Sequence, residues 1–189
     1  MSILNRIFGN REKTGKAKIV VLGPSKAGKT TFVKYLEYGK PVLEETRTTI
    51  GIDIRPNPVF IDNWEFTVID VGGQKLYQET FWNLGIQQAD AVIYLIDGLI
   101  RQEHVNFKEA LRQFKYILNL IDNAVPLLIL VNKQDLKEEN PLTLEEASEL
   151  FSLAELSGRS MNIIPTSAKY GDGVTTAMEW LIDKLEELK

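Results

Sequence analysis

Short apolar runs alternate with segments of helical spacing along most of this chain. Continuous apolar runs bounded by turn residues are typical of strands that are buried on both faces of a parallel sheet. Such strands are expected at residues 18–22, 91–96, 126–131 and 162–165. Two further strands are predicted at residues 51–60 and 64–69, because Ile61-Asp62-Asn63 between them suits a hairpin turn.

Helical patterns separate these strands. One helix is expected to end at Gly39 after residues 32–38, and Thr143 to Glu146 is a capping box that begins another. A third helix is predicted by helical spacing of Val105, Ala110, Leu111, Phe114, Ile117, Leu118 and Ile121. A final amphipathic helix follows Gly171-Asp172-Gly173. We therefore expect an α/β fold, with a mostly parallel six-stranded sheet, one antiparallel edge strand and helices on both faces.

The first strand is followed directly by Gly23-Pro24-Ser25-Lys26-Ala27-Gly28-Lys29-Thr30, the GxxxxGK[ST] pattern of a phosphate-binding loop. Its backbone N–H groups are expected to cradle phosphates at a helix N-terminus. Lys29 would supply charge to the β and γ phosphates, and the Thr30 hydroxyl can ligate Mg²⁺. The predicted phosphate-side residues are Gly23, Ser25, Lys26, Ala27, Gly28, Lys29, Thr30 and Thr31. The alternative is a turn rich in glycine and lysine that binds nothing.

Asp70-Val71-Gly72-Gly73-Gln74 follows the third strand. An acidic residue at a strand end holds the metal, usually through water, in nucleoside-triphosphate hydrolases. Gly73 would let the backbone approach the γ-phosphate, and Gln74 is placed to orient an attacking water. We therefore predict Asp70 as a metal residue, Gly73 as a nucleotide-binding residue and Gln74 as a catalytic residue.

Asn132-Lys133-Gln134-Asp135 follows the fifth strand, and Thr166-Ser167-Ala168-Lys169 follows the sixth. The Asp135 carboxylate can accept hydrogen bonds from the N1–H and 2-amino groups of guanine, which adenine does not offer. A backbone N–H of the second motif could meet guanine O6. The predicted base-side residues are Asn132, Lys133, Asp135, Ser167, Ala168 and Lys169. Asp135 argues against an ATP-dependent kinase or ATPase.

These four motifs, in this order, resemble those of Ras-like small GTPases over residues 17–188. The DVGGQ form of residues 70–74 and the NKQDL form of residues 132–136 are similar to those of the Arf family. The resemblance implies a P-loop G domain that binds GTP, GDP and Mg²⁺, hydrolyses GTP slowly and acts as a molecular switch. It also implies that Thr49 binds Mg²⁺ and caps the γ-phosphate, with Thr48 as the alternative. Lys29, Thr49 and Gln74 are then the catalytic set, and Thr30, Thr49 and Asp70 the metal set.

The same resemblance implies effectors, an exchange factor and a GTPase-activating protein as partners. Arg47 is a weak candidate for a catalytic arginine within the chain, so the activating partner is expected to supply one. The alternative function is a structural subunit that holds GTP without hydrolysing it, and the intact Gln74 argues against this alternative.

Residues 1–16 are expected to form an N-terminal arm, and residues 17–189 the G domain. Residues 1–18 carry five basic residues against Glu12 alone, a net +4 in a chain of net charge −4. Apolar side chains would share one face of a helix in this arm: Ile3, Leu4, Ile7 and Phe8. Weak peripheral membrane contact through residues 3–8 is therefore expected, with a loose basic arm or a helix packed on the core as alternatives. Ser2 stands where lipidated Arf proteins carry glycine, so N-myristoylation is not expected.

The overall negative charge argues against nucleic acid as a partner. The chain has no cysteine, which excludes disulfides, thiolate metal sites, prenylation and palmitoylation. No apolar run approaches the ~20 residues needed to span a bilayer, and no secretory signal is recognisable. We therefore expect a cytoplasmic protein, with reversible membrane association through the arm.

Some positions depart from the Arf pattern. Pro24-Ser25-Lys26 replaces the usual Leu-Asp pair and the variable position that follows it, and Ile69 replaces a tryptophan. Thr166-Ser167-Ala168-Lys169 is closer to the Ras version of that motif. A divergent Arf-like protein fits these differences. His104, the only histidine, is expected at the surface.

Overall fold

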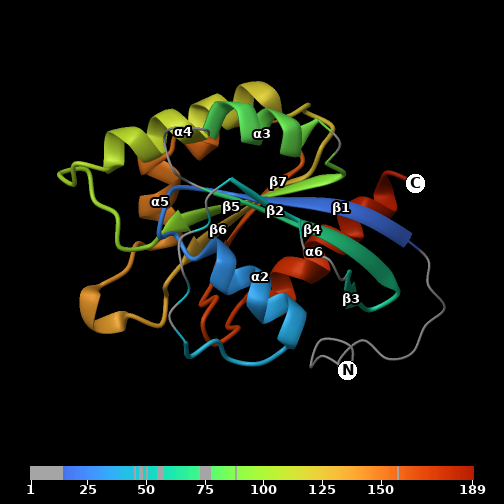
Figure 1. Ribbon diagram of the computed structural model, residues 1–189. Helices are drawn as coiled ribbons and strands as arrows, with labels where there is room; N and C mark the ends of the chain where they lie inside the picture. Colours follow the sequence, from blue (N-terminus) through green and yellow to red (C-terminus); the bar gives the residue numbers. More distant parts are fainter. Residues whose placement is uncertain are drawn as a thin grey trace.

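The computed structural model describes residues 15–44, 46, 49, 51–54, 58–72, 78–87, 89–156 and 158–189. These residues form one sheet with helices on both faces (Figure 1). The strands are β1 (Gly15–Leu22), β2 (Ile52–Ile54), β3 (Val59–Ile61), β4 (Trp64–Val71), β5 (Ala91–Asp97), β6 (Leu127–Asn132) and β7 (Met161–Pro165). The helices are α2 (Lys29–Tyr38), α3 (Gln78–Ile86), α4 (Phe107–Leu120), α5 (Leu144–Leu150) and α6 (Val174–Glu187), with short 3-10 helices η1 (Lys137–Glu139) and η2 (Leu153–Leu156).

The order of strands across the sheet is β2-β4-β1-β5-β6-β7, and β3 also pairs with β4. The neighbours from β4 to β7 in this order are all parallel. Their registers place Val21 beside Asp70, Asp97 beside Asn132 and Val131 beside Pro165. The segments that follow β1, β4, β5, β6 and β7 therefore leave the sheet at the same edge. The expected α/β fold with a mostly parallel sheet is confirmed.

The antiparallel edge differs in one respect from the prediction. A single strand at residues 51–60 was expected, whereas the structure has two separate three-residue strands, β2 and β3, which both pair with β4. Pro58 directly precedes β3, and a proline has no N–H to donate to a sheet. The prediction of one continuous strand is wrong because Pro58 is not part of a strand, and the described residues form seven strands instead of six.

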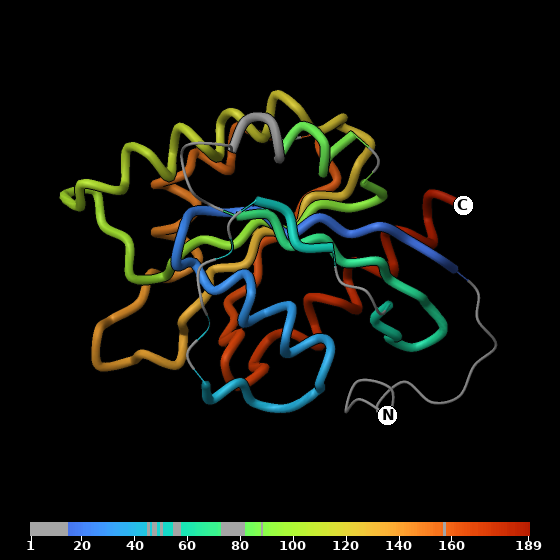
Figure 2. The backbone as a smooth tube through the Cα atoms, in the orientation of Figure 1, coloured from blue at the N-terminus to red at the C-terminus, as the bar shows by residue number. Residues whose placement is uncertain are grey.

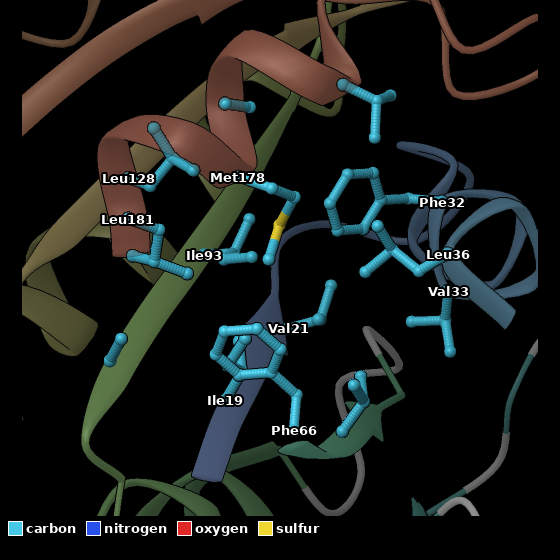
Figure 3. Packing of buried hydrophobic residues seen from close by; sticks show 14 of the residues in the cluster. Ile19, Val21, Phe32, Val33, Leu36, Phe66, Ile93, Leu128, Met178 and Leu181 are labelled. Atoms are coloured by element: carbon cyan, nitrogen blue, oxygen red, sulfur yellow. The ribbon is translucent and has the colours of Figure 1, made fainter. Parts of the chain in front are cut away.

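Two apolar cores lie on opposite faces of the sheet. Alternate residues of β1 divide between them, Ile19 and Val21 into one core and Val20 and Leu22 into the other. Helices α2 and α6 cover the first face, whereas α3, α4 and α5 cover the second (Figure 1). Figure 3 shows the first core, where side chains of the two helices meet over β1 and β5: Phe32, Leu36, Met178, Leu181, Val21 and Ile93. Burial on both faces explains why the central strands are apolar throughout.

The predicted helix ends are largely confirmed. Helix α2 ends at Gly39, and Thr143 caps α5 through paired bonds with Glu146 of 3.2 and 2.8 Å. Val105 was predicted to belong to the apolar spacing of the third helix. This prediction is wrong, because Val105 is 94% exposed and lies before α4. The loop before α4 has its own hydrogen bonds, including one from the Phe107 N–H to the His104 carbonyl. His104 is exposed, as expected.

Most of the expected N-terminal arm lies outside the described residues, including Ser2 and the apolar positions at residues 3–8. Gly15 and Lys16 belong to β1 and pair with β4. Among the described residues, no helix combines the length and the apolar character needed to cross a membrane.

Candidate nucleotide-binding site

A cavity of about 700 Å³ lies at the edge where the parallel strands end. Twelve of the predicted site residues line it: Ser25, Lys26, Gly28, Lys29, Thr30, Thr31, Thr49, Asn132, Lys133, Asp135, Ala168 and Lys169. They come from segments that are far apart in the sequence, and the topology brings them together. Gly23, Ala27, Asp70 and Ser167 do not line the cavity, and all four contact residues that do.

Residues 23–30, the phosphate loop, join β1 to α2. Gly23 has φ +139°, and a Cβ atom there would overlap the Leu95 carbonyl oxygen of β5, so only glycine fits at the start of this loop. The Lys29 ammonium group donates to the carbonyls of Gly23 and Pro24, each at 2.9 Å. The loop therefore bends around the lysine side chain, with its ends on β1 and α2.

Lys29 is only 6% exposed. Burial lowers the pKa of this lysine to about 8, and the nearby Asp70 carboxylate opposes that decrease. A partly desolvated ammonium group held by neutral carbonyls attracts an anion strongly, because a phosphate oxygen is a better partner than a carbonyl. The phosphate loop is thus built for a negatively charged ligand.

Three oxygen-bearing side chains converge beside the phosphate loop. The Thr30 hydroxyl lies 2.9 Å from the Thr49 hydroxyl and donates to the Asp70 carboxylate at 2.6 Å. The Thr49 hydroxyl donates to the same carboxylate oxygen at 3.2 Å. Asp70 is fully buried at the end of β4. Hydroxyl and carboxylate oxygens are the ligand type that Mg²⁺ prefers, so this donor set fits a magnesium ion shared with a phosphate.

In the part of the chain that the structure describes, no three His, Cys, Asp or Glu residues are grouped to hold a metal. Mg²⁺ is commonly held by few protein oxygen ligands together with phosphate oxygens, so Thr30, Thr49 and Asp70 beside the phosphate loop are the residues that would hold it.

Asn132 joins the two halves of the site. Its side chain is 2% exposed, donates to the Ala27 carbonyl at 2.7 Å and accepts from the Ala168 N–H at 2.8 Å. Ala27 belongs to the phosphate loop, and Ala168 belongs to residues 166–173, which we name the base loop. One buried amide thus connects two loops that are more than a hundred residues apart in the sequence.

Asp135 lines the cavity and is held by the base loop. Its Oδ1 accepts a hydrogen bond from the Ser167 hydroxyl at 2.8 Å. Lys133 adopts φ +69° and forms an ion pair with Asp97 of β5 at 2.7 Å. Residues 132–135 and the base loop are therefore in direct contact beside the cavity.

Sequence reasoning missed Asp97 and five of the described residues that line the cavity: Val42, Leu43, Glu44, Thr46 and Leu136. Asp97 pairs with Lys133, and Thr46 lines the cavity with its hydroxyl 3.2 Å from that of Thr31. Asp97 ends an apolar strand beside Asn132 in the register, which is a usable signal. Nothing in the spacing of Thr46 distinguishes it from the other polar residues of its segment.

Several predicted residues cannot be placed. Gly73, Gln74, Arg47 and Thr48 lie outside the described residues, although Thr49, next to Thr48, is placed at the Thr30–Asp70 cluster. The roles predicted for Gly73 and Gln74 remain predictions from the sequence.

A phosphate loop, an oxygen cluster and a base loop along one edge of a mostly parallel sheet define the class: a P-loop nucleotide-binding domain of the small-GTPase type. The model of the ADP-ribosylation factor (Arf) family matches residues 1–185. ADP-ribosylation factor-like protein 3 of Chlamydomonas reinhardtii is 33% identical, over 98% of this chain and 100% of the relative. ADP-ribosylation factor-like protein 1 of Drosophila melanogaster is also 33% identical, over 100% of this chain and 98% of the relative.

Among solved structures, the Arl6 BBS3 small GTPase of Trypanosoma brucei, with a bound nucleotide analogue GppNp, has the same fold. Its TM-score is 0.77 at 23% identity, over 92% of this chain and 99% of that chain. The chain therefore belongs to the ADP-ribosylation factor family of small GTPases. It is a GTPase and a GTP-binding switch, and the resemblance found in the sequence is confirmed.

Proposed function

We propose that the cavity binds Mg²⁺–GTP and GDP through the residues placed around it. The observation that carries this proposal is the Asn132 bridge. It holds the phosphate loop and the base loop on either side of one cavity, at 2.7 and 2.8 Å. A site that reads phosphates at one end and a base at the other matches the shape and chemistry of a nucleotide.

On the phosphate side, Lys29 would exchange its carbonyl partners for the β and γ phosphate oxygens. Thr30 and Thr49 would hold Mg²⁺ directly, with Asp70 behind them through water, and the bound metal would neutralise phosphate charge. Gly73 would donate its N–H to the γ-phosphate, and Gln74 would orient the attacking water. These last two roles rest on the sequence motif alone. Catalysis of this kind consists of positioning and electrostatic stabilisation, and a slow intrinsic rate is expected because a partner would supply the catalytic arginine.

On the base side, Asp135 would accept hydrogen bonds from guanine N1–H and the 2-amino group. The Ala168 N–H already donates to Asn132. The neighbouring Lys169 N–H is therefore the donor that we propose for guanine O6. Ser167 would keep the Asp135 carboxylate in place through the 2.8 Å hydrogen bond.

Loss of the γ-phosphate would remove a ligand of the Thr49 region and of Gly73, and so change the surface that partners contact. Effectors, an exchange factor and an activating protein that supplies an arginine are the partners that this switch requires. Residues 3–8 would add weak, reversible contact with anionic membranes to a cytoplasmic protein.

The decisive experiment begins with nucleotide analysis of the purified full chain. Single-turnover GTP hydrolysis then compares the wild type with Gln74→Leu. Bound GDP, with slow hydrolysis that the substitution slows further, is the expected result. Bound GTP that persists, with no effect of Gln74→Leu, would instead identify a nucleotide-holding structural subunit. A protein that retains neither nucleotide and binds neither in solution would refute the proposed site.

A further inference from the structure

Helix α2 contacts the base loop through Tyr35. Gly171 in that loop has φ +92°, and a Cβ atom there would overlap the Tyr35 ring. The phenol ring therefore lies directly on the Gly171 backbone. Tyr35 is only 9% exposed, so the ring is enclosed between the helix and the loop. No other residue type at position 171 leaves room for this contact.

Gly171 is bonded to the part of the loop that would read the base. Its N–H donates to the Ser167 carbonyl at 2.7 Å, and the Ser167 N–H donates to the Asp172 carbonyl at 3.0 Å. The Ser167 hydroxyl in turn donates to Asp135. Gly171 is thus connected through Ser167 to Asp135, the carboxylate proposed to bind guanine, by hydrogen bonds of 2.7 and 2.8 Å.

The same helix begins at the phosphate loop. Lys29 and Thr30 form its first turn, and Tyr35 lies about 9 Å further along the axis at 1.5 Å per residue. The segment after α2 also touches the base loop, because the Val42 N–H donates to the Lys169 carbonyl at 2.8 Å. Figure 2 shows this segment, which leaves α2 and runs beside the C-terminal part of the chain that contains the base loop.

We propose that Tyr35 is a positioning residue for the guanine base: it clamps Gly171, and through Ser167 it keeps Asp135 aligned. The proposal rests on the proposed function of the cavity. Tyr35 would make no contact with the nucleotide itself. Burial raises the pKa of the Tyr35 phenol, and the Asp172 carboxylate adds to this increase. The contribution that we propose is one of packing, because the ring occupies the space next to the Gly171 backbone.

The test measures release of GDP, GTP and inosine diphosphate (IDP) from the full chain and its variants. IDP lacks the 2-amino group, so the ratio of IDP to GDP release rates reports the Asp135 contact. Tyr35→Ala is expected to accelerate GDP and GTP release by the same factor, about tenfold, because aromatic-to-alanine changes in packed sites are costly. The IDP to GDP ratio should fall towards one. Tyr35→Phe keeps the ring and should behave as the wild type.

Two control variants separate positioning from general instability. Tyr38→Ala removes a tyrosine from the same helix that is 57% exposed, and should change nothing. Leu36→Val alters the buried core beneath α2 (Figure 3), so it should lower the melting temperature and leave the IDP to GDP ratio at the wild-type value. Gly171→Ala displaces the ring from the loop side and should reproduce Tyr35→Ala.

The outcomes are distinguishable. If the wild type does not bind GDP, the proposed function itself fails. If the wild type binds GDP, and Tyr35→Ala and Gly171→Ala keep its release rates and its IDP to GDP ratio, only the role of Tyr35 is refuted. The same refutation follows if Tyr35→Ala lowers the melting temperature as Leu36→Val does while the ratio is unchanged.

Discussion

Replacement of Asn132 by alanine is the sharpest test of how the site is assembled. The substitution removes the donor to the Ala27 carbonyl and the acceptor of the Ala168 N–H, both in a region with almost no solvent access. Each buried group left without a partner costs about 1–3 kcal/mol, so the two together cost about 2–6 kcal/mol. A loss of ~4 kcal/mol, the middle of this range, lowers the melting temperature of a chain of this size by roughly 8–16 °C.

The same substitution should also release nucleotide faster. Without Asn132 the phosphate loop and the base loop are no longer held together, so nucleotide binding has to order them. If ~1.4 kcal/mol of the lost free energy is taken from nucleotide binding, release becomes about tenfold faster. Thermal unfolding of the nucleotide-free protein measures the first effect, and release of a fluorescent GDP measures the second. Asn119→Ala, on the exposed side of α4, is the matched control and should change neither. Unfolding and release that both match the wild type would show that the bridge does not organise the site.

Three further predictions follow from the site and the core. Asp135→Asn should shift preference from guanine to xanthine nucleotides in competition binding, and unchanged GTP affinity would refute the base assignment. Chelation of Mg²⁺ should accelerate GDP release from the wild type but not from Thr30→Val, and equal sensitivity of both would remove Thr30 from the metal site. Phe114→Ala, fully buried between Tyr94 and Phe151, should lower the free energy of unfolding by about 3–5 kcal/mol in urea titration. A loss below about 1 kcal/mol would mean that this core relaxes around the gap.

The central strands were predictable because they are buried on both faces. The runs at β5 and β6 contain almost only apolar side chains, and that pattern needs no knowledge of the partner strands. The phosphate loop was predictable because its requirements are local. Its glycines and its lysine stand at fixed spacing between a strand and a helix, and this pattern is visible in the sequence. The ligand-facing motifs each follow a strand end, where the topology of a parallel sheet collects them.

Features that depend on contacts between distant segments were not predictable. The exposure of Val105 is decided by the contacts of the loop before α4, which periodicity does not encode. Tyr35 looks like an ordinary helix residue in the sequence, and the strand-end position of Asp97 marks it as a candidate without revealing its partner. Their importance appears only when Lys133 and Gly171 are seen beside them.

The Asn132 bridge has a consequence for synthesis of the protein on the ribosome. A nascent chain that has emerged only as far as β6 already contains the phosphate loop and Asn132, yet the Ala168 N–H that completes the bridge is still missing. Strong retention of nucleotide should therefore begin only after β7 and the base loop have left the exit tunnel. Until then the ligand adds little to the stability of the partly folded chain, because only a bound ligand shifts the folding equilibrium. Cellular nucleotide would thus stabilise this fold late, as a final step in its maturation.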